Sequence, residues 1–218
     1  MKHRLVIFDL DGTLLNTIGD LAAACEDMLI RRALPQHTLA EYTSFVGNGI
    51  RNLVKRSLPE ELRTDEYVEQ AKADFVDYYT HNIHNHTLPY EGITELLSEL
   101  QRAGVRIAVA SNKFHEGTLQ LISHFFSDIN FVAVYGNREG FPLKPDAQLI
   151  EEIMQLGGAT NSECVMVGDS AVDIQTAHNA GIASIAESRG YRSMEQLEQA
   201  NPDHIATSVE QLRHILLS

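Results

Sequence analysis

Short apolar runs alternate along this sequence with amphipathic helical patterns, and this alternation limits the possible folds more than any other feature. The first run is Leu5–Phe8, and similar runs follow at 105–110, 131–134, 164–167 and 182–185. Each run is almost continuously apolar, as expected for a parallel strand that helices cover on both faces. The helical stripes between them end at glycines, as helices often do. The sequence therefore predicts an α/β fold with a doubly wound parallel sheet.

One long segment interrupts this alternation. Residues 15–86 contain helical patterns and no convincing strand. Within them, Thr17 and Asp20 have the spacing of a capping box at the start of a helix. A block of this length is too long for a simple connection between two strands. We therefore predict an α-helical cap domain at 15–86, inserted into an α/β core that comprises 1–14 and 87–218.

The charge balance bears on the choice of partner. The chain of 218 residues has 17 basic and 30 acidic side chains, a net charge of −13. This charge disfavours nucleic acid and anionic membranes, because both attract cationic proteins. No apolar stretch approaches the roughly 18 residues of a membrane span, and carboxylates interrupt the N-terminal apolar run. We therefore expect a cytoplasmic protein that binds neither nucleic acid nor membrane, with monomer and homodimer both left open.

Carboxylates gather where two of the expected strands end. Asp9 and Asp11 follow the first strand in FDLDGT, and Asp169 and Asp173 follow the strand at 164–167 in GDSAVD. Ligands of open α/β sheets bind at the carboxyl ends of the strands. If these two strands are neighbours, the four carboxylates converge, and they repel one another unless a cation lies between them. An oxygen-rich cluster of this kind is typical of Mg²⁺ sites.

Two further motifs follow other strands of the core. Ser111, Asn112 and Lys113 offer a hydroxyl, an amide and an expected helix N-terminus, all suited to phosphate oxygens. Lys144 precedes a helix expected near Asp146, where an ammonium can neutralise a carboxylate and a phosphate together. Each feature alone also fits an ordinary turn, cap or surface cation. Their occurrence in this order at successive strand ends favours a site that handles phosphate.

The four motifs FDLDGT, VASNK, LKP and VGDSAVD resemble those of the haloacid dehalogenase-like phosphohydrolases. The similarity extends from Asp9 to about Tyr191 and implies a Rossmann-like core with a small helical cap. The chain looks most like the phosphoglycolate phosphatase branch, because FVGNGIRNLVKRSL resembles its specificity loop and SRGYR its Gly-Tyr segment. It departs from that branch at Asn16, where many relatives have Asp, and in lacking a Trp before the Gly-Tyr pair.

The resemblance implies a role for each carboxylate. Asp9 would be the nucleophile that becomes an aspartyl phosphate. Asp11 would protonate the leaving oxygen and then activate water. Mg²⁺ would be held by the Asp9 carboxylate, the Asp11 backbone carbonyl and Asp169. Asp173 would lie behind these ligands or bind the metal through a water molecule.

The resemblance also implies which residues bind substrate. Those expected to bind the phosphate group are Thr13, Ser111, Asn112 and Lys144. Those expected to select the substrate, in the cap, are Gly47, Asn48, Gly49 and Arg51.

The implied activity is that of a Mg²⁺-dependent phosphomonoester phosphatase acting on a small phosphorylated metabolite, with 2-phosphoglycolate favoured. The same motifs also fit a phosphomutase, a sugar-phosphate phosphatase or an inorganic pyrophosphatase. A phosphonate hydrolase would need a lysine in the cap, for which Lys55 and Lys72 are the candidates. A non-catalytic interaction module is the alternative from another class, and the presence of all four motifs disfavours it.

Overall fold

The computed structural model describes residues 3–218, which form two compact units. Among these residues, the sheet unit comprises 3–15 and Pro89–Ser218, and the helical unit comprises Asn16–Leu88. The boundaries expected from the sequence differ slightly, because they assign residue 15 to the helical block and 87–88 to the core.

The chain crosses between the two units at a pair of very short strands. It leaves the sheet unit in β2 (Leu15–Asn16) and returns in β3 (Leu88–Pro89). These two strands are hydrogen-bonded neighbours in a small sheet of their own. The helical unit is therefore an insertion whose two ends are held together.

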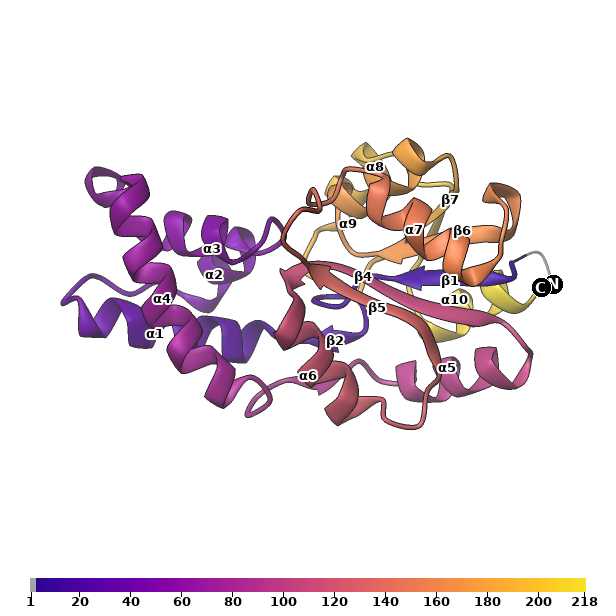
Figure 1. The fold of residues 1–218 in the computed structure, drawn as a ribbon, viewed down its shortest axis with the longest axis horizontal. Coiled ribbons are helices and arrows are strands. Elements are labelled where there is room, and N and C mark those ends of the chain that lie inside the picture. The colour runs from indigo at the N-terminus through magenta and orange to yellow at the C-terminus, as the bar shows by residue number, and fades with distance from the viewer. Residues whose placement is uncertain (1–2) are drawn as a thin grey trace. The chain divides into compact units, whose positions relative to one another are not determined.

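Six parallel strands form the main sheet, in the order β5-β4-β1-β6-β7-β8 (Figure 1). Their bounds are Leu5–Phe8 (β1), Arg106–Phe114 (β4), Phe131–Asn137 (β5), Cys164–Gly168 (β6), Ala183–Glu187 (β7) and His204–Ala206 (β8). The predicted doubly wound α/β fold is confirmed, and β8 is a strand that the sequence reading did not include. β1 pairs with β4 on one side and with β6 on the other. The sheet thus grows in opposite directions from β1, which creates the switch point where such folds bind ligands.

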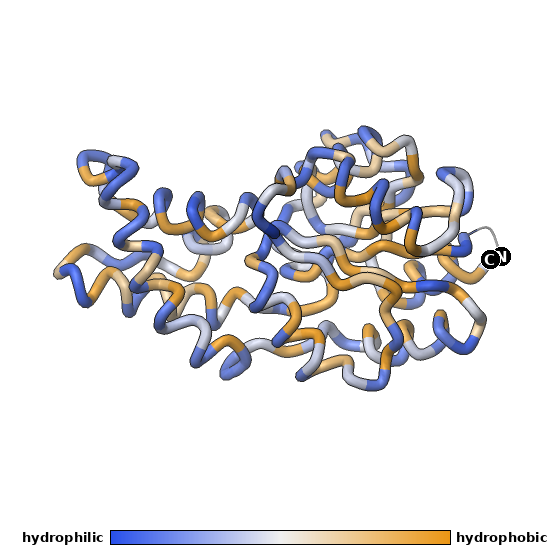
Figure 2. The backbone as a smooth tube through the Cα atoms, viewed as in Figure 1, coloured by the Kyte–Doolittle hydropathy of each residue, from blue (hydrophilic) through white to orange (hydrophobic). Residues whose placement is uncertain are grey.

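Helices cover both faces of this sheet. Figure 1 shows α7 and α8 on one face and α5 and α10 on the other. The helices of the sheet unit are α5 (Ile93–Arg102), α6 (His115–Phe125), α7 (Gln148–Gly157), α8 (Ala171–Ala180), α9 (Met194–Gln199) and α10 (Val209–Leu217), with a 3₁₀ turn at Asn161–Glu163. The tube in Figure 2 is hydrophobic along the central strands, and every residue of β1 and β6 is buried. Continuous apolar runs in the sequence therefore correspond to strands covered on both sides.

The helical unit contains four α-helices. They are α1 (Ile18–Arg31), α2 (Leu39–Phe45), α3 (Ile50–Ser57) and α4 (Asp65–Asn82), with a 3₁₀ turn at Glu60–Leu62. Thr38 and Thr64 cap α2 and α4 with their side chains. The core of the unit is formed by buried apolar residues that include Met28, Leu29, Tyr42, Val54, Phe75 and Tyr79. Within residues 3–218, no helix has the length and apolar character needed to cross a membrane.

The start of α1 differs from the sequence prediction. Thr17 is the N-cap residue, but its side chain does not cap the helix, so the expected capping box with Asp20 is not formed. The buried Asp20 carboxylate instead accepts hydrogen bonds from the backbone of His86 at 2.9 Å and of Thr87 at 2.8 Å, and from the Thr87 hydroxyl at 2.7 Å. Asp20 therefore pairs with residues 86–87 instead of with Thr17, and these hydrogen bonds connect the start of the helical unit to its end.

Candidate active site

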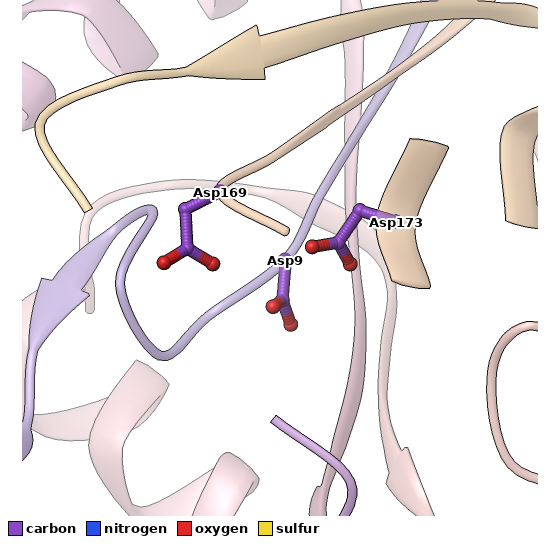
Figure 3. Close-up of side chains that lie close together, drawn as sticks. All are labelled: Asp9, Asp169 and Asp173. Carbon is purple, nitrogen blue, oxygen red and sulfur yellow. The ribbon is translucent and has the colours of Figure 1, made fainter. Parts of the chain in front are cut away.

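Three carboxylates meet at the edge of the sheet where β1 and β6 end (Figure 3). Asp9 directly follows β1, Asp169 directly follows β6, and Asp173 lies in the first turn of α8. One oxygen from each lies within 4.8 Å of the others, and all three residues are buried. The convergence arises because β1 and β6 are parallel neighbours whose carboxyl ends reach the same edge.

Lys144 provides the positive charge beside these carboxylates. Its Nζ lies 2.9 Å from Asp9 Oδ1 and 2.7 Å from Asp173 Oδ1, and it donates to the backbone carbonyl of Ala110 at 2.8 Å. The side chain is 2% exposed, and its ammonium makes two hydrogen bonds and a further ion pair inside the protein. Burial alone would lower the pKa of Lys144, but Asp173 and Asp9 hold that pKa above its ordinary value. The ammonium is therefore a fixed internal cation.

The carboxylates of this cluster are under electrostatic strain. Burial raises the pKa of Asp9 to about 7, with Lys144 opposing the shift and Asp173 adding to it. Burial also raises the pKa of Asp169 well above its ordinary value, and the neighbouring charges of Asp173 and Asp9 raise it further. Each shift reports the cost of placing negative charges together away from water. A cation bound between Asp9 and Asp169 would relieve that cost.

The hydrogen bonds show which carboxylates are best able to bind such a cation. Asp173 uses one oxygen for Lys144, and its other oxygen accepts from the Ser170 hydroxyl at 2.6 Å and the Ser170 backbone at 3.1 Å. Within residues 3–218, Asp9 forms an ion pair with Lys144 through one oxygen, and Asp169 accepts the backbone N–H of Tyr191 through one oxygen. Asp9 and Asp169 thus retain oxygens that fit a hard, oxygen-binding cation such as Mg²⁺.

Asp11 does not join this group, although the sequence predicts that four carboxylates converge. Its carboxylate lies 3.1 Å from Nζ of Lys113, whose side chain is 1% exposed. The sequence reading assigned no role to Lys113. No local pattern pointed to this contact, because the two residues are 102 positions apart and the expected strand ended at Ala110. Two buried lysines therefore pair with different carboxylates: Lys144 with Asp9 and Asp173, and Lys113 with Asp11.

The segment that contains Ser111 is strand and not the start of a helix. β4 continues to Phe114, and α6 begins only at His115, so the expected helix N-terminus is not at Ser111–Lys113. After an irregularity that follows Ala110, β4 pairs with β5 again at Phe114, opposite Asn137, so the strand does not end at Ala110. The helix expected near Asp146 likewise begins slightly later, at Gln148.

The residues expected to bind phosphate have distinct environments. The Asn112 amide accepts from the backbone N–H of Lys144 at 2.8 Å and donates to the Lys144 carbonyl at 3.1 Å, which favours a role in holding Lys144. Ser111 is buried, and its Oγ accepts from the Lys113 backbone at 3.3 Å. The buried hydroxyl of Thr13 has no hydrogen-bond partner in the described chain. Thr13 is therefore the candidate most in need of a ligand.

The expected specificity residues lie in the helical unit. Gly47, Asn48 and Gly49 connect α2 to α3, and Gly49 is the N-cap residue of α3. Arg51, in the first turn of α3, forms ion pairs with Asp65 and Glu69 of α4. The guanidinium of Arg51 is thus engaged within the unit, and its role in selectivity stays a prediction.

Two glycines allow the backbone to approach Asp169 closely. Gly12 has a φ of 85°, and a Cβ at this position would overlap the Asp169 carboxylate. A Cβ at Gly190 would overlap Asp169 and the carbonyl of Gly12. The neighbouring Tyr191 donates its backbone N–H to Asp169 Oδ2 at 2.7 Å. The sequence reading noted the Gly-Tyr pair but did not place it against Asp169.

Comparison with known proteins identifies a family for this chain. The sequence model of the family described as "Haloacid dehalogenase-like hydrolase" matches residues 6–187. The chain belongs to the haloacid dehalogenase-like hydrolases. The resemblance seen in its four motifs is thus confirmed, and the chain is an enzyme of this hydrolase family.

Relatives within the haloacid dehalogenase-like hydrolases cover nearly the whole chain. A "Phosphoglycolate phosphatase" from Vibrio vulnificus is 35% identical over 98% of this chain and 96% of its own length. Another from Mesorhizobium japonicum is 33% identical over 88% of this chain and 85% of its own. The crystal structure of a protein from Lactobacillus delbrueckii subsp. bulgaricus is 29% identical, has a TM-score of 0.92 and covers 99% of both chains.

Proposed function

We propose that this hydrolase is a Mg²⁺-dependent phosphomonoester phosphatase that forms an aspartyl phosphate on Asp9. The observation that carries this proposal is the buried Lys144 ammonium, which joins Asp9 and Asp173 at the switch point of the sheet. A carboxylate nucleophile and a phosphate group are both negative and repel each other. Fixed positive charge at this point offsets the repulsion and stabilises the transferring group.

The reaction proceeds in two steps at Asp9 and Asp11. In the first, the Asp9 carboxylate attacks phosphorus, the bond to the leaving oxygen breaks, and Asp11 gives that oxygen a proton. In the second, Asp11 takes a proton from water, the water oxygen attacks phosphorus, and inorganic phosphate leaves Asp9. The ion pair with Lys113 holds the Asp11 carboxylate in place at the sheet edge.

The residues around this pair fit the metal and the phosphate. Asp9 and Asp169 would hold Mg²⁺, together with the Asp11 backbone carbonyl. Bound there, the ion supplies positive charge that offsets the carboxylates and the substrate phosphate. Asp173 would then keep Lys144 in position, as its contacts with Lys144 and Ser170 already indicate. The buried hydroxyl of Thr13 would donate to a phosphate oxygen, because it is otherwise unpaired in the described chain.

The proposed substrate is a small phosphorylated metabolite, and 2-phosphoglycolate is favoured. The names of the relatives from Vibrio vulnificus and Mesorhizobium japonicum support this choice. The net charge of −13 also favours a small ligand at one locally neutralised point over nucleic acid or a membrane surface. If Arg51 contacts a substrate carboxylate, it must first give up its ion pair with Asp65 or Glu69.

The test is phosphate release from a panel of phosphorylated metabolites, with Mg²⁺ and with excess chelator. The panel includes 2-phosphoglycolate, a hexose 1-phosphate and pyrophosphate. We expect Mg²⁺-dependent release of inorganic phosphate, fastest from 2-phosphoglycolate. Conversion of the hexose phosphate to its isomer without free phosphate would identify a phosphomutase. Equal turnover with chelator would contradict the role of the metal.

A further inference from the structure

The connection between β7 and α9 contains a segment that lies directly against Asp169. Tyr191 donates its backbone N–H to Asp169 Oδ2, and Gly190 leaves no room for a Cβ beside Asp169 and Gly12. Contacts this close leave little room for either Asp169 or residues 190–191 to move. The position of the Asp169 carboxylate therefore depends on how firmly residues 190–191 are held.

An ion pair holds this segment to the end of the sheet. Arg189 Nε lies 2.8 Å from Glu187 Oε1, and Arg189 Nη2 lies 3.0 Å from Glu187 Oε2. The backbone N–H of Arg189 also donates to Glu187 Oε1, at 3.1 Å. Glu187 is the last residue of β7, pairs with Ala206 of β8, and has a side chain that is 1% exposed. A two-point contact of this kind fixes orientation as well as distance.

The same guanidinium has a third anchor in the sheet unit. Arg189 Nη1 donates to the backbone carbonyl of Glu91 at 3.0 Å, and the guanidinium carbon lies 5.9 Å from the centre of the Tyr90 ring. These contacts connect the end of β7 with the chain that follows β3. An ammonium lacks the planar fork that reaches Glu187 and Glu91 together. The arrangement is thus specific to arginine.

We propose that Arg189 is a positioning residue for the metal site. By fixing residues 189–191 against Glu187 and Glu91, it keeps the Tyr191 N–H on Asp169 and so orients that carboxylate for a divalent cation. This inference rests on the metal site of the proposed function, but it assigns Arg189 no contact with substrate or metal. Groups that orient a ligating carboxylate typically change metal affinity by 10- to 100-fold when they are removed.

The test compares Arg189→Met with Arg213→Met in the full chain. Arg213 is a matched control, because it forms an ion pair with Glu99 at 2.7 Å in the same unit and has no contact with Asp169 among those described. Mg²⁺ binding is measured by titration calorimetry without substrate, and exchange of the Tyr191 amide hydrogen is measured by NMR. For Arg189→Met we expect roughly tenfold weaker Mg²⁺ binding and faster exchange at Tyr191. For Arg213→Met we expect wild-type values of both.

Several results would overturn the proposal. Arg189→Met with wild-type Mg²⁺ affinity would do so, as would an equal loss of affinity in Arg213→Met. If Arg189→Met does not fold, the double variant Glu187→Gln/Arg189→Met replaces it, because it also removes the unpaired buried charge of Glu187. That variant must show the same loss of Mg²⁺ affinity. If the wild-type protein binds no Mg²⁺, the proposed metal site is also wrong. If the wild-type protein is a Mg²⁺-dependent phosphatase and Arg189→Met has the same Mg²⁺ affinity, only the inference about Arg189 is wrong.

Discussion

The two units of the molecule contain lysine–carboxylate pairs of nearly the same length in very different surroundings. In the sheet unit, Lys144 and Asp173 lie 2.7 Å apart with side chains 2% and 1% exposed. In the helical unit, Lys72 and Glu69 lie 2.9 Å apart with side chains 38% and 50% exposed. Water and salt screen the exposed pair, whereas the buried pair interacts strongly and was costly to desolvate.

This difference shows why distance alone does not identify a functional pair. The exposed pair is one of many contacts that a helix surface forms at little cost. At the sheet edge, burial raises the pKa of Asp9 and Asp169, and Lys144 is retained there as a charged group. Buried groups with displaced pKa values that gather at one point are typical of catalytic sites. The contrast can be tested by changing matched residues in the two units.

The largest effect is expected from Asp9→Asn. The variant keeps the shape of the side chain but removes the nucleophile, so turnover of an aryl phosphate should fall by at least ~10⁴-fold. The control is Asp77→Asn in the helical unit, where Asp77 pairs with Arg31 and its side chain is 64% exposed. Steady-state kinetics with matched circular dichroism spectra check the result. Activity near that of the wild type in Asp9→Asn would discard the mechanism.

The second comparison is Lys144→Met against Lys72→Met. Loss of Lys144 leaves buried carboxylates without their cation, which should cost about 3–5 kcal/mol of unfolding free energy. Turnover should also fall, by roughly 10²-fold or more, because charge on the transferring group is less well stabilised. For Lys72→Met we expect a change below about 1 kcal/mol and wild-type turnover. Urea unfolding measures the stability of both variants, and steady-state kinetics measures their turnover. Equal changes in stability and turnover in the two variants would contradict this contrast.

The third prediction concerns pH in the metal-free protein. The pKa of Asp9 is about 7 in the fold against an ordinary 3.8, so the folded state binds this proton more tightly than the unfolded state. The stability linked to that proton is complete below the ordinary value and is lost as the pH rises through about 7. With chelator present, the unfolding free energy should fall more steeply between about pH 4 and about pH 7 in the wild type than in Asp9→Asn. Parallel pH profiles of the two proteins would refute this.

The smallest effect is expected from Arg51→Ala in the helical unit. Arg51 pairs with Asp65 and Glu69 on an exposed helix surface. The loss of these pairs should change the unfolding free energy by no more than about 1 kcal/mol, and added salt should reduce the change further. A rise in KM for 2-phosphoglycolate without this loss of stability would support a role of Arg51 in selectivity. A large loss of unfolding free energy would show that the exposed ion pairs of Arg51 contribute as much to stability as the buried pairs at the sheet edge.

The fold was predictable from sequence wherever burial left a strong pattern. β1 and β6 are apolar along their whole length because both faces are covered, and the carboxylates that follow them mark the sheet edge. β8 was not predictable in this way, because it is three residues long and begins with the exposed His204. The extension of β4 to Phe114 was also missed, because the register shifts after Ala110 and the next pair joins Phe114 to Asn137.

The candidate site was predictable in composition but not in its contacts. Asp9, Asp169 and Lys144 could be named because each follows a recognisable strand or precedes a helix. The Asn112 amide on the Lys144 backbone and the Lys113 ammonium on Asp11 could not, because they join residues 32 and 102 positions apart. Such contacts depend on the order of the strands and on side-chain direction, which a local pattern does not specify.

The pairing of β2 with β3 has a consequence for how proteins of this design can change. The helical unit begins and ends in these two hydrogen-bonded strands, so its ends are roughly one strand spacing apart, about 4.8 Å. An insert of different length or sequence can occupy the same position without altering the order of the six strands or the residues that follow β1 and β6. In evolutionary terms, the insert is an exchangeable module, and the chemistry of the sheet edge can be inherited unchanged while the module diverges.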